Sequence, residues 1–204
     1  MNSPRTPGLL RRLLAFCNWR LYLVWPVFVL LVYAAFFGES GLLSKAFNEV
    51  LAPIVLGLAG LVFLGRWLSE RKPLILILLA LNISLFCREL HFAGTSKGIY
   101  VALVLVAVWG LLWWRNIARD LHESSTTPYL LFALATYVLS QAVARRVFRG
   151  ILPLEAESDF FRTGLEESLE NLAHLAMLAV AVLGFSRGCQ ADDDPPKRGH
   201  SGDT

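Results

Sequence analysis

The sequence predicts an all-α integral membrane protein, a bundle of six transmembrane helices, and two observations support this prediction. The 204 residues are 55% hydrophobic and only 17% charged, with a mean hydropathy of +0.53. Soluble domains usually carry about a quarter of charged residues. The second observation is a series of six apolar segments, which cover residues 21–38, 50–65, 73–87, 98–114, 124–144 and 171–186.

The first apolar segment reads as a retained helix. It is charge-free and exceeds the roughly 7–15 apolar residues of a signal peptide. The aromatic residues Trp19, Tyr22 and Trp25 stand at its start, and such side chains favour the membrane interface. Pro26 predicts a kink in this helix.

The later segments differ in length, and the difference is informative. A spanning helix needs about 17–25 mainly apolar residues. This length is reached by the fourth segment, which ends at Trp113 and Trp114, and by the fifth, 124–144. The second, third and sixth are too short. We therefore expect the third helix to continue into Arg88 and its neighbours, and the sixth to begin before Glu170.

The distribution of basic residues predicts the orientation. One side of a six-helix bundle would hold twelve Lys and Arg residues and the other side seven. The positive-inside rule then places both termini in the cytoplasm, and we expect a bacterial inner membrane. The twelve are Arg5, Arg11, Arg12, Arg20, Arg66, Arg71, Lys72, Arg115, Arg119, Arg187, Lys197 and Arg198.

The chain divides into one membrane domain and two flanking segments. Residues 1–19 form a cytoplasmic N-terminal segment, residues 20–186 the membrane domain, and residues 187–204 a polar tail that we expect to be disordered. The expected partner is the lipid bilayer. A net charge of +3 is too small to indicate nucleic-acid binding.

Ionisable residues near the third and sixth segments predict a site. At about 100° per residue, Glu167, Glu170 and His174 share one narrow stripe of a helix. An ionisable group in the bilayer costs about 2.5–3.5 kcal/mol, so such groups face the bundle interior and find partners. The ends of the third and fifth segments lie on the same, outer side as the start of the sixth. We expect an outward-facing pocket between these three helices, with Arg88, Arg145 and Arg146 as counter-charges.

These residue types suggest three kinds of chemistry. We predict Glu167, Glu170 and His174 as catalytic residues. A divalent metal is a second possibility, because carboxylates and imidazoles suit zinc, manganese or iron; the candidate ligands are Glu89, His91, Glu167, Glu170 and His174. Haem between His91 and His174 is disfavoured, because they are about two turns apart in depth, roughly 12 Å.

Two functions remain open. The pocket binds or processes a lipid or small molecule, or the chain is a structural or accessory subunit whose charged stripe only packs helices. A proton pathway is less favoured, because polar residues occupy only the outer half of the bundle. Tyr137, Ser140 and Gln141 in the fifth segment extend that polar region slightly.

Overall fold

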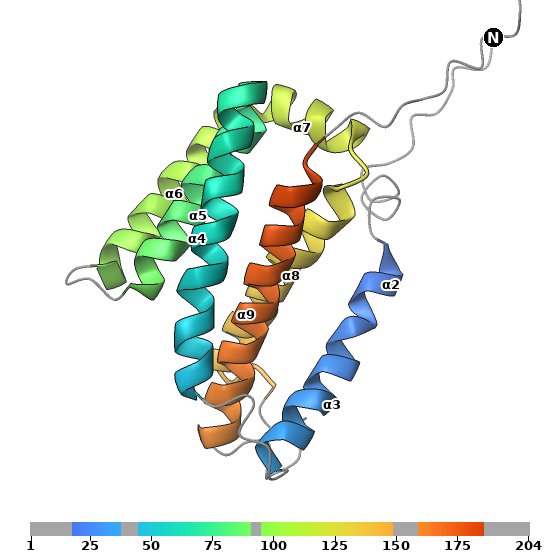
Figure 1. The fold of residues 1–204 in the computed structure, drawn as a ribbon, viewed down its shortest axis with the longest axis vertical. Helices are drawn as coiled ribbons and strands as arrows, with labels where there is room; N and C mark the ends of the chain where they lie inside the picture. The colour runs from blue at the N-terminus through green and yellow to red at the C-terminus, as the bar shows by residue number, and fades with distance from the viewer. Residues whose placement is uncertain (1–17, 38–44, 91–94, 149–158, 186–204) are drawn as a thin grey trace, which may run out of the picture.

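The computed structural model describes residues 18–37, 45–90, 95–148 and 159–185 (Figure 1). Within these residues 89% are helical and no strand is present, so the all-α prediction is confirmed. Residues 1–17 and the predicted tail, 187–204, lie outside the described residues. The helices are α2 (Trp19–Tyr22), α3 (Val24–Phe37), α4 (Lys45–Glu70), α5 (Pro73–Glu89), α6 (Thr95–Leu112), α7 (Trp114–Glu123), α8 (Thr127–Ala144) and α9 (Asp159–Leu183).

The first predicted apolar segment forms two helices, α2 and α3, which meet at Leu23. Each of the other five segments corresponds to a helix, and the two expected extensions are present. The third segment forms α5, which begins with Pro73 in its first turn and continues through Arg88 to Glu89. The sixth forms α9, which begins at Asp159 and so includes Glu170. By length and composition, Phe47–Glu70 and Thr127–Ala144 are suited to crossing a membrane, and α6 with α7 would be a third span if the bent pair counts as one.

The fourth segment departs from the prediction. Its helix ends at Leu112, and the chain turns by 81° into α7, which the sequence pattern did not predict. Arg115, Arg119 and Asp120 make α7 polar, whereas Ile117 is buried in the core. α7 therefore lies across one end of the bundle (Figure 1). We call this the α7 end.

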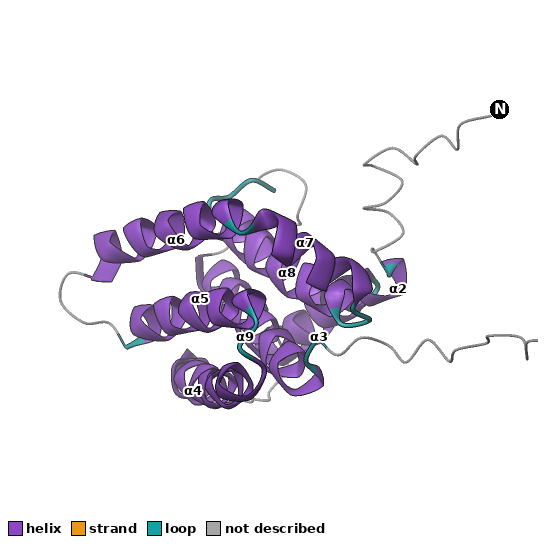
Figure 2. Cartoon of the chain, turned by 90° about the horizontal axis from the view of Figure 1, so that it is seen from above, coloured by secondary structure: helices purple, strands orange, loops and turns teal. Residues whose placement is uncertain are grey.

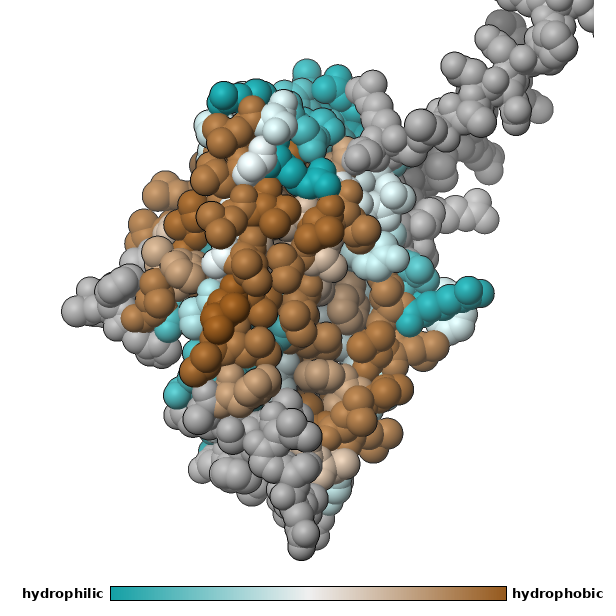
Figure 3. All heavy atoms as spheres, viewed as in Figure 1, coloured by the Kyte–Doolittle hydropathy of each residue, from teal (hydrophilic) through white to brown (hydrophobic). Residues whose placement is uncertain are grey.

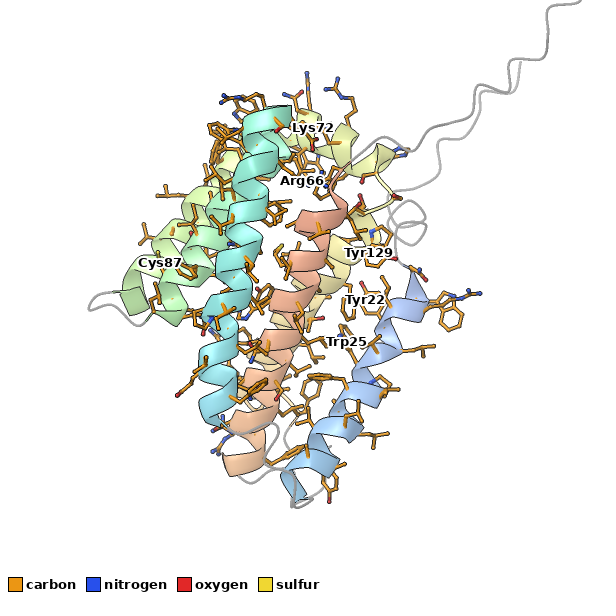
Figure 4. All side chains as sticks on the ribbon, in the orientation of Figure 1. Tyr22, Trp25, Arg66, Lys72, Cys87 and Tyr129 are labelled. Atoms are coloured by element: carbon orange, nitrogen blue, oxygen red, sulfur yellow. The ribbon has the colours of Figure 1, made fainter. Side chains whose placement is uncertain are left out.

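Helix α9 is the centre of the bundle. It packs against α8 and α4, while α5 packs against α4 and α6 lies beyond α5 (Figure 2). Helices α2 and α3 lie on the opposite side, and the indole nitrogen Nε1 of Trp25 donates a hydrogen bond to Thr136 Oγ1 of α8 at 3.1 Å (Figure 4). Trp25 is thus half-buried against α8. The sequence analysis expected this residue at the membrane interface and did not predict the contact with α8.

The surface around the bundle is apolar. Large hydrophobic side chains that are more than half exposed include Leu30, Leu61, Val101 and Val138. On the face drawn in Figure 3, hydrophobic side chains cover the middle of the bundle and hydrophilic side chains gather at the α7 end; we call this apolar surface the belt. Such a belt is the surface that a hydrocarbon solvent favours, and it is large for a protein in water.

The C-terminal end of α9 is closed by cations. Arg66 Nη2 donates to the Val182 carbonyl at 2.6 Å, and Lys72 Nζ donates to the Phe185 carbonyl at 2.9 Å (Figure 4). Thr126 Oγ1 donates to the carbonyl of Gly184. The last carbonyls of a helix lack intrahelical partners and carry partial negative charge, so two cations and a hydroxyl stabilise this end.

Gly184 permits this arrangement, and replacing it tests the arrangement. Its φ is +69°, and a Cβ atom there would lie 1.8 Å from Arg66 Nη1. We expect Gly184→Ala to lower the free energy of unfolding by about 1–3 kcal/mol, because the residue is strained and Arg66 is displaced. Thermal unfolding of the detergent-solubilised protein measures this.

Gly65→Ala is the matched control. A Cβ at Gly65 meets nothing within 4 Å, and the residue lies inside α4. Alanine should there be neutral or stabilising by up to about 1 kcal/mol. Equal stability of the two variants would contradict the closed end of α9.

Candidate functional site

Four charged or polar side chains from α5, α8 and α9 form one connected group. Arg88 Nη2 contacts Glu170 Oε2 at 2.6 Å and Glu89 Oε1 at 2.8 Å, and Arg88 Nε donates to Glu89 Oε1 at 3.1 Å. Gln141 Nε2 donates to the second oxygen of Glu170, Oε1, at 3.0 Å. We call Arg88, Glu89, Gln141 and Glu170 the polar cluster. Three of the four residues belong to the set that the sequence predicted, and the structure brings them together.

The polar cluster is largely shielded from solvent. The side chains of Glu170 and Glu89 are 14% and 15% exposed, and that of Arg88 is 30% exposed. Taking a carboxylate out of water costs several kcal/mol unless a cation and hydrogen bonds replace the lost hydration. Both oxygens of Glu170 have such partners, one from Arg88 and one from Gln141. The contacts of Glu170 therefore compensate its own burial and join three helices.

A second group of polar side chains lies next to the polar cluster and has no partners. His174, one helical turn beyond Glu170, is completely buried, and neither of its ring nitrogens has a hydrogen-bond partner. The same holds for Tyr137 Oη, whereas Ser140 Oγ, also completely buried, interacts with the carboxylate of Glu170. The ring centroids of Tyr137 and His174 are 5.5 Å apart, and the ring planes are tilted by 59°. We call Tyr137 and His174 the unpartnered group.

Helical spacing explains why these side chains meet. Tyr137, Ser140 and Gln141 are at i, i+3 and i+4 on α8, and Glu170 and His174 are at i and i+4 on α9. Residues so spaced lie on one face of a helix. Because α8 and α9 pack against each other, these two faces line one stretch of their interface. The sequence analysis included the α8 residues only as a slight extension of the polar region. Their i, i+3 and i+4 spacing was nevertheless a signal that they share one face of the helix.

An unpartnered buried group needs an explanation. More than 90% of buried polar groups have a partner, and a missing one costs about 1–3 kcal/mol. Three such atoms from two neighbouring side chains are therefore costly together. Water or a ligand that bonds to them would remove that cost.

The other predicted site residues are placed differently. Glu166 and Glu167 are half-buried on the turn of α9 before Glu170. Arg145 and Arg146 are exposed at the end of α8, so Arg88 is the cation that the structure pairs with Glu170. His91 lies outside the described residues.

The described residues do not form the predicted metal centre. No three His, Cys, Asp or Glu side chains among them are arranged to hold a metal ion. Arg88 gives a physical reason, because its guanidinium occupies Glu170 Oε2 and Glu89 Oε1, where a cation would bind. The predicted ligand set also includes His91, which the structure does not describe.

The polar region ends one turn beyond His174. Met177, Val180 and Ala181 follow on the same helix and are completely buried with Phe63 in an apolar cluster. The site is therefore closed toward the α7 end by packed apolar side chains.

Elsewhere on α9, Asn171 Nδ2 donates to Asn48 Oδ1 of α4 at 3.0 Å, a buried contact that the sequence pattern did not indicate.

Comparison with models of protein families, with curated proteins and with solved structures finds no match for this chain.

The polar cluster predicts different effects for two carboxylates of α9. Glu170→Gln removes the charged acceptor of Arg88 and should lower the free energy of unfolding by about 1.5–3 kcal/mol. Glu166 is half-buried and has no ion pair within the described chain, so Glu166→Gln should change stability by less than about 0.5 kcal/mol. Thermal or denaturant unfolding in detergent compares them. Similar losses in both variants would mean that Glu170 is merely a solvated residue of the helix.

Proposed function

We propose that the chain is a multi-pass protein of a bacterial inner membrane that binds a lipid or small molecule at the polar cluster and the unpartnered group. Six crossings would be made by α2 with α3, α4, α5, α6, α8 and α9, while α7 would not cross. The apolar belt and the two or three helices suited to crossing support membrane insertion. The excess of Lys and Arg around the α7 end supports cytoplasmic termini and a site that opens outward.

The observation that carries this proposal is the unpartnered group beside a charged cluster. A neutral imidazole offers one donor and one acceptor, and the hydroxyl of Tyr137 offers both. A ligand with polar atoms, or water that a ligand displaces, would satisfy them. The apolar cluster around Met177 closes the inner side, so the arrangement suits a binding site better than a path through the membrane.

The charge of the polar cluster indicates the kind of ligand. Two carboxylates, Glu89 and Glu170, face one guanidinium, which leaves one negative charge in excess. Burying an uncompensated charge is costly, so a positive group or a proton would be favoured there. We infer that the ligand carries an amine or a similar cationic hydrogen-bond donor. Glu167, Glu170 and His174 stay the predicted catalytic residues should the ligand be processed as well as bound.

A structural role is the second candidate, and one observation favours it. Arg88 and Gln141 both bond to Glu170, so the cluster fastens α5 and α8 to α9 without any ligand. Buried ion pairs of this kind often set helix packing. In that case the unpartnered group would be a tolerated cost, and the chain would be an accessory subunit.

Amine-bearing lipid tests the binding proposal. Phosphatidylethanolamine is the probe, and phosphatidylcholine, whose quaternary ammonium has no N–H donor, is the comparison. We expect phosphatidylethanolamine to raise the unfolding free energy of the detergent-solubilised chain by about 2.7 kcal/mol at one hundred times its dissociation constant. No difference between the two lipids, with soluble ethanolamine also without effect, would contradict the proposal and favour the structural role.

Tyr137→Phe separates binding from stability. Because Tyr137 Oη has no partner, its removal should leave the ligand-free protein as stable as the wild type or more stable. It should nevertheless weaken the stabilisation by phosphatidylethanolamine. Tyr129→Phe is the matched control, since Tyr129 is an exposed tyrosine near the start of α8. Unchanged lipid stabilisation in Tyr137→Phe would exclude the unpartnered group as part of the site.

A further inference from the structure

The direction of α7 differs from that of the helices around it. The 81° bend after Leu112 turns the chain from α6, which runs along the bundle, to α7, which lies across its end (Figures 1 and 2). The inner side of α7 is fixed, because Ile117 is buried and Leu121 packs against the same core cluster. If α6 crosses a bilayer, α7 lies nearly parallel to the membrane surface.

The outer side of α7 carries two exposed arginines. Arg115 and Arg119 are one turn apart, which places their Cβ atoms about 6 Å from each other. Among the side chains that the structure describes, which do not include that of Glu123, neither arginine has an ion pair. Asp120 is half-buried about 100° around the helix from Arg119. Two other cations of the α7 end, Arg66 and Lys72, bind Glu70 and, respectively, the carbonyls of Val182 and Phe185 at the end of α9.

Four exposed apolar residues at the bend, which we call the apolar ledge, precede these arginines in the sequence. Leu111 and Leu112 are 71% and 79% exposed, and Trp113 and Trp114 are also exposed at the bend. Leucines this exposed favour acyl chains, and tryptophan favours the level of the headgroups. A basic side next to an apolar ledge is the pattern of a helix that lies in the membrane interface.

We propose that α7 is an interfacial helix that binds anionic phospholipid headgroups through Arg115 and Arg119. A guanidinium forms paired hydrogen bonds with phosphate, and two of them one turn apart suit one or two headgroups. The apolar ledge identifies the ligand as a lipid, because a free phosphate would leave Leu111 and Leu112 exposed. This surface is separate from the polar cluster between α5, α8 and α9.

Lipid binding to the purified full-length chain tests this proposal. Native mass spectrometry would measure the affinity for phosphatidylglycerol, with phosphatidylcholine as the zwitterionic comparison. Each basic residue near an anionic surface contributes about 1 kcal/mol. We therefore expect Arg115→Gln and Arg119→Gln each to weaken phosphatidylglycerol binding about fivefold, and the double variant roughly 25-fold.

Arg145→Gln is the matched control, since Arg145 is equally an exposed arginine but lies at the end of α8. It should bind phosphatidylglycerol as the wild type does. Unfolding temperatures of all variants confirm that they fold, which exposed substitutions should permit. Equal binding of the two lipids by the wild type, wild-type affinity in the double variant, or displacement of the lipid by an equal concentration of inorganic phosphate would overturn the proposal.

Discussion

A guanidinium shared by two carboxylates inside an apolar bundle is the interaction on which this structure depends. Arg88 ends a helix of 17 residues, about 25 Å long, beside a helix of 25 residues, about 38 Å long. Because α5 begins at the α7 end, where α9 ends, the last residues of α5 lie beside the middle of α9, where Glu170 is. A carboxylate at that depth needs a cation, and Arg88 fixes the level of α5 against α9 by supplying it.

The middle and the C-terminal end of α9 have different polar surroundings. Near its middle, Glu170 is paired with a cation from α5, and the unpartnered group begins there. At its C-terminal end, Arg66, Lys72 and Thr126 satisfy the last carbonyls. Packed apolar residues around Met177 separate these two polar regions. This separation is why the proposed binding site, which is closed toward the α7 end, explains the charges better than a continuous pathway.

The sequence was sufficient for features that depend on length and periodicity. The short third and sixth apolar segments predicted that Arg88 and Glu170 would be helical residues inside the bundle, and both are. The sequence was insufficient where a tertiary contact or a turn decides. The bend before α7 occurs without proline, and only the packing of Ile117 shows which way α7 lies. Arg145 and Arg146 were expected as counter-charges, but α8 ends there, and the positive φ of Arg146, 56°, marks the turn that leaves them exposed. The contact between Asn48 and Asn171 depends on how α4 and α9 are rotated, which no spacing in one sequence reveals.

A double-mutant cycle on Arg88 and Glu170 tests the central interaction most directly. The free energies of unfolding of Arg88→Gln, Glu170→Gln and the double variant would be compared with that of the wild type in one detergent. The contact at 2.6 Å predicts a coupling energy of about 2 kcal/mol, with the double variant less destabilised than the sum of the single ones. Additivity within about 0.5 kcal/mol would show that the two residues act independently, and would contradict the pairing that holds α5 against α9.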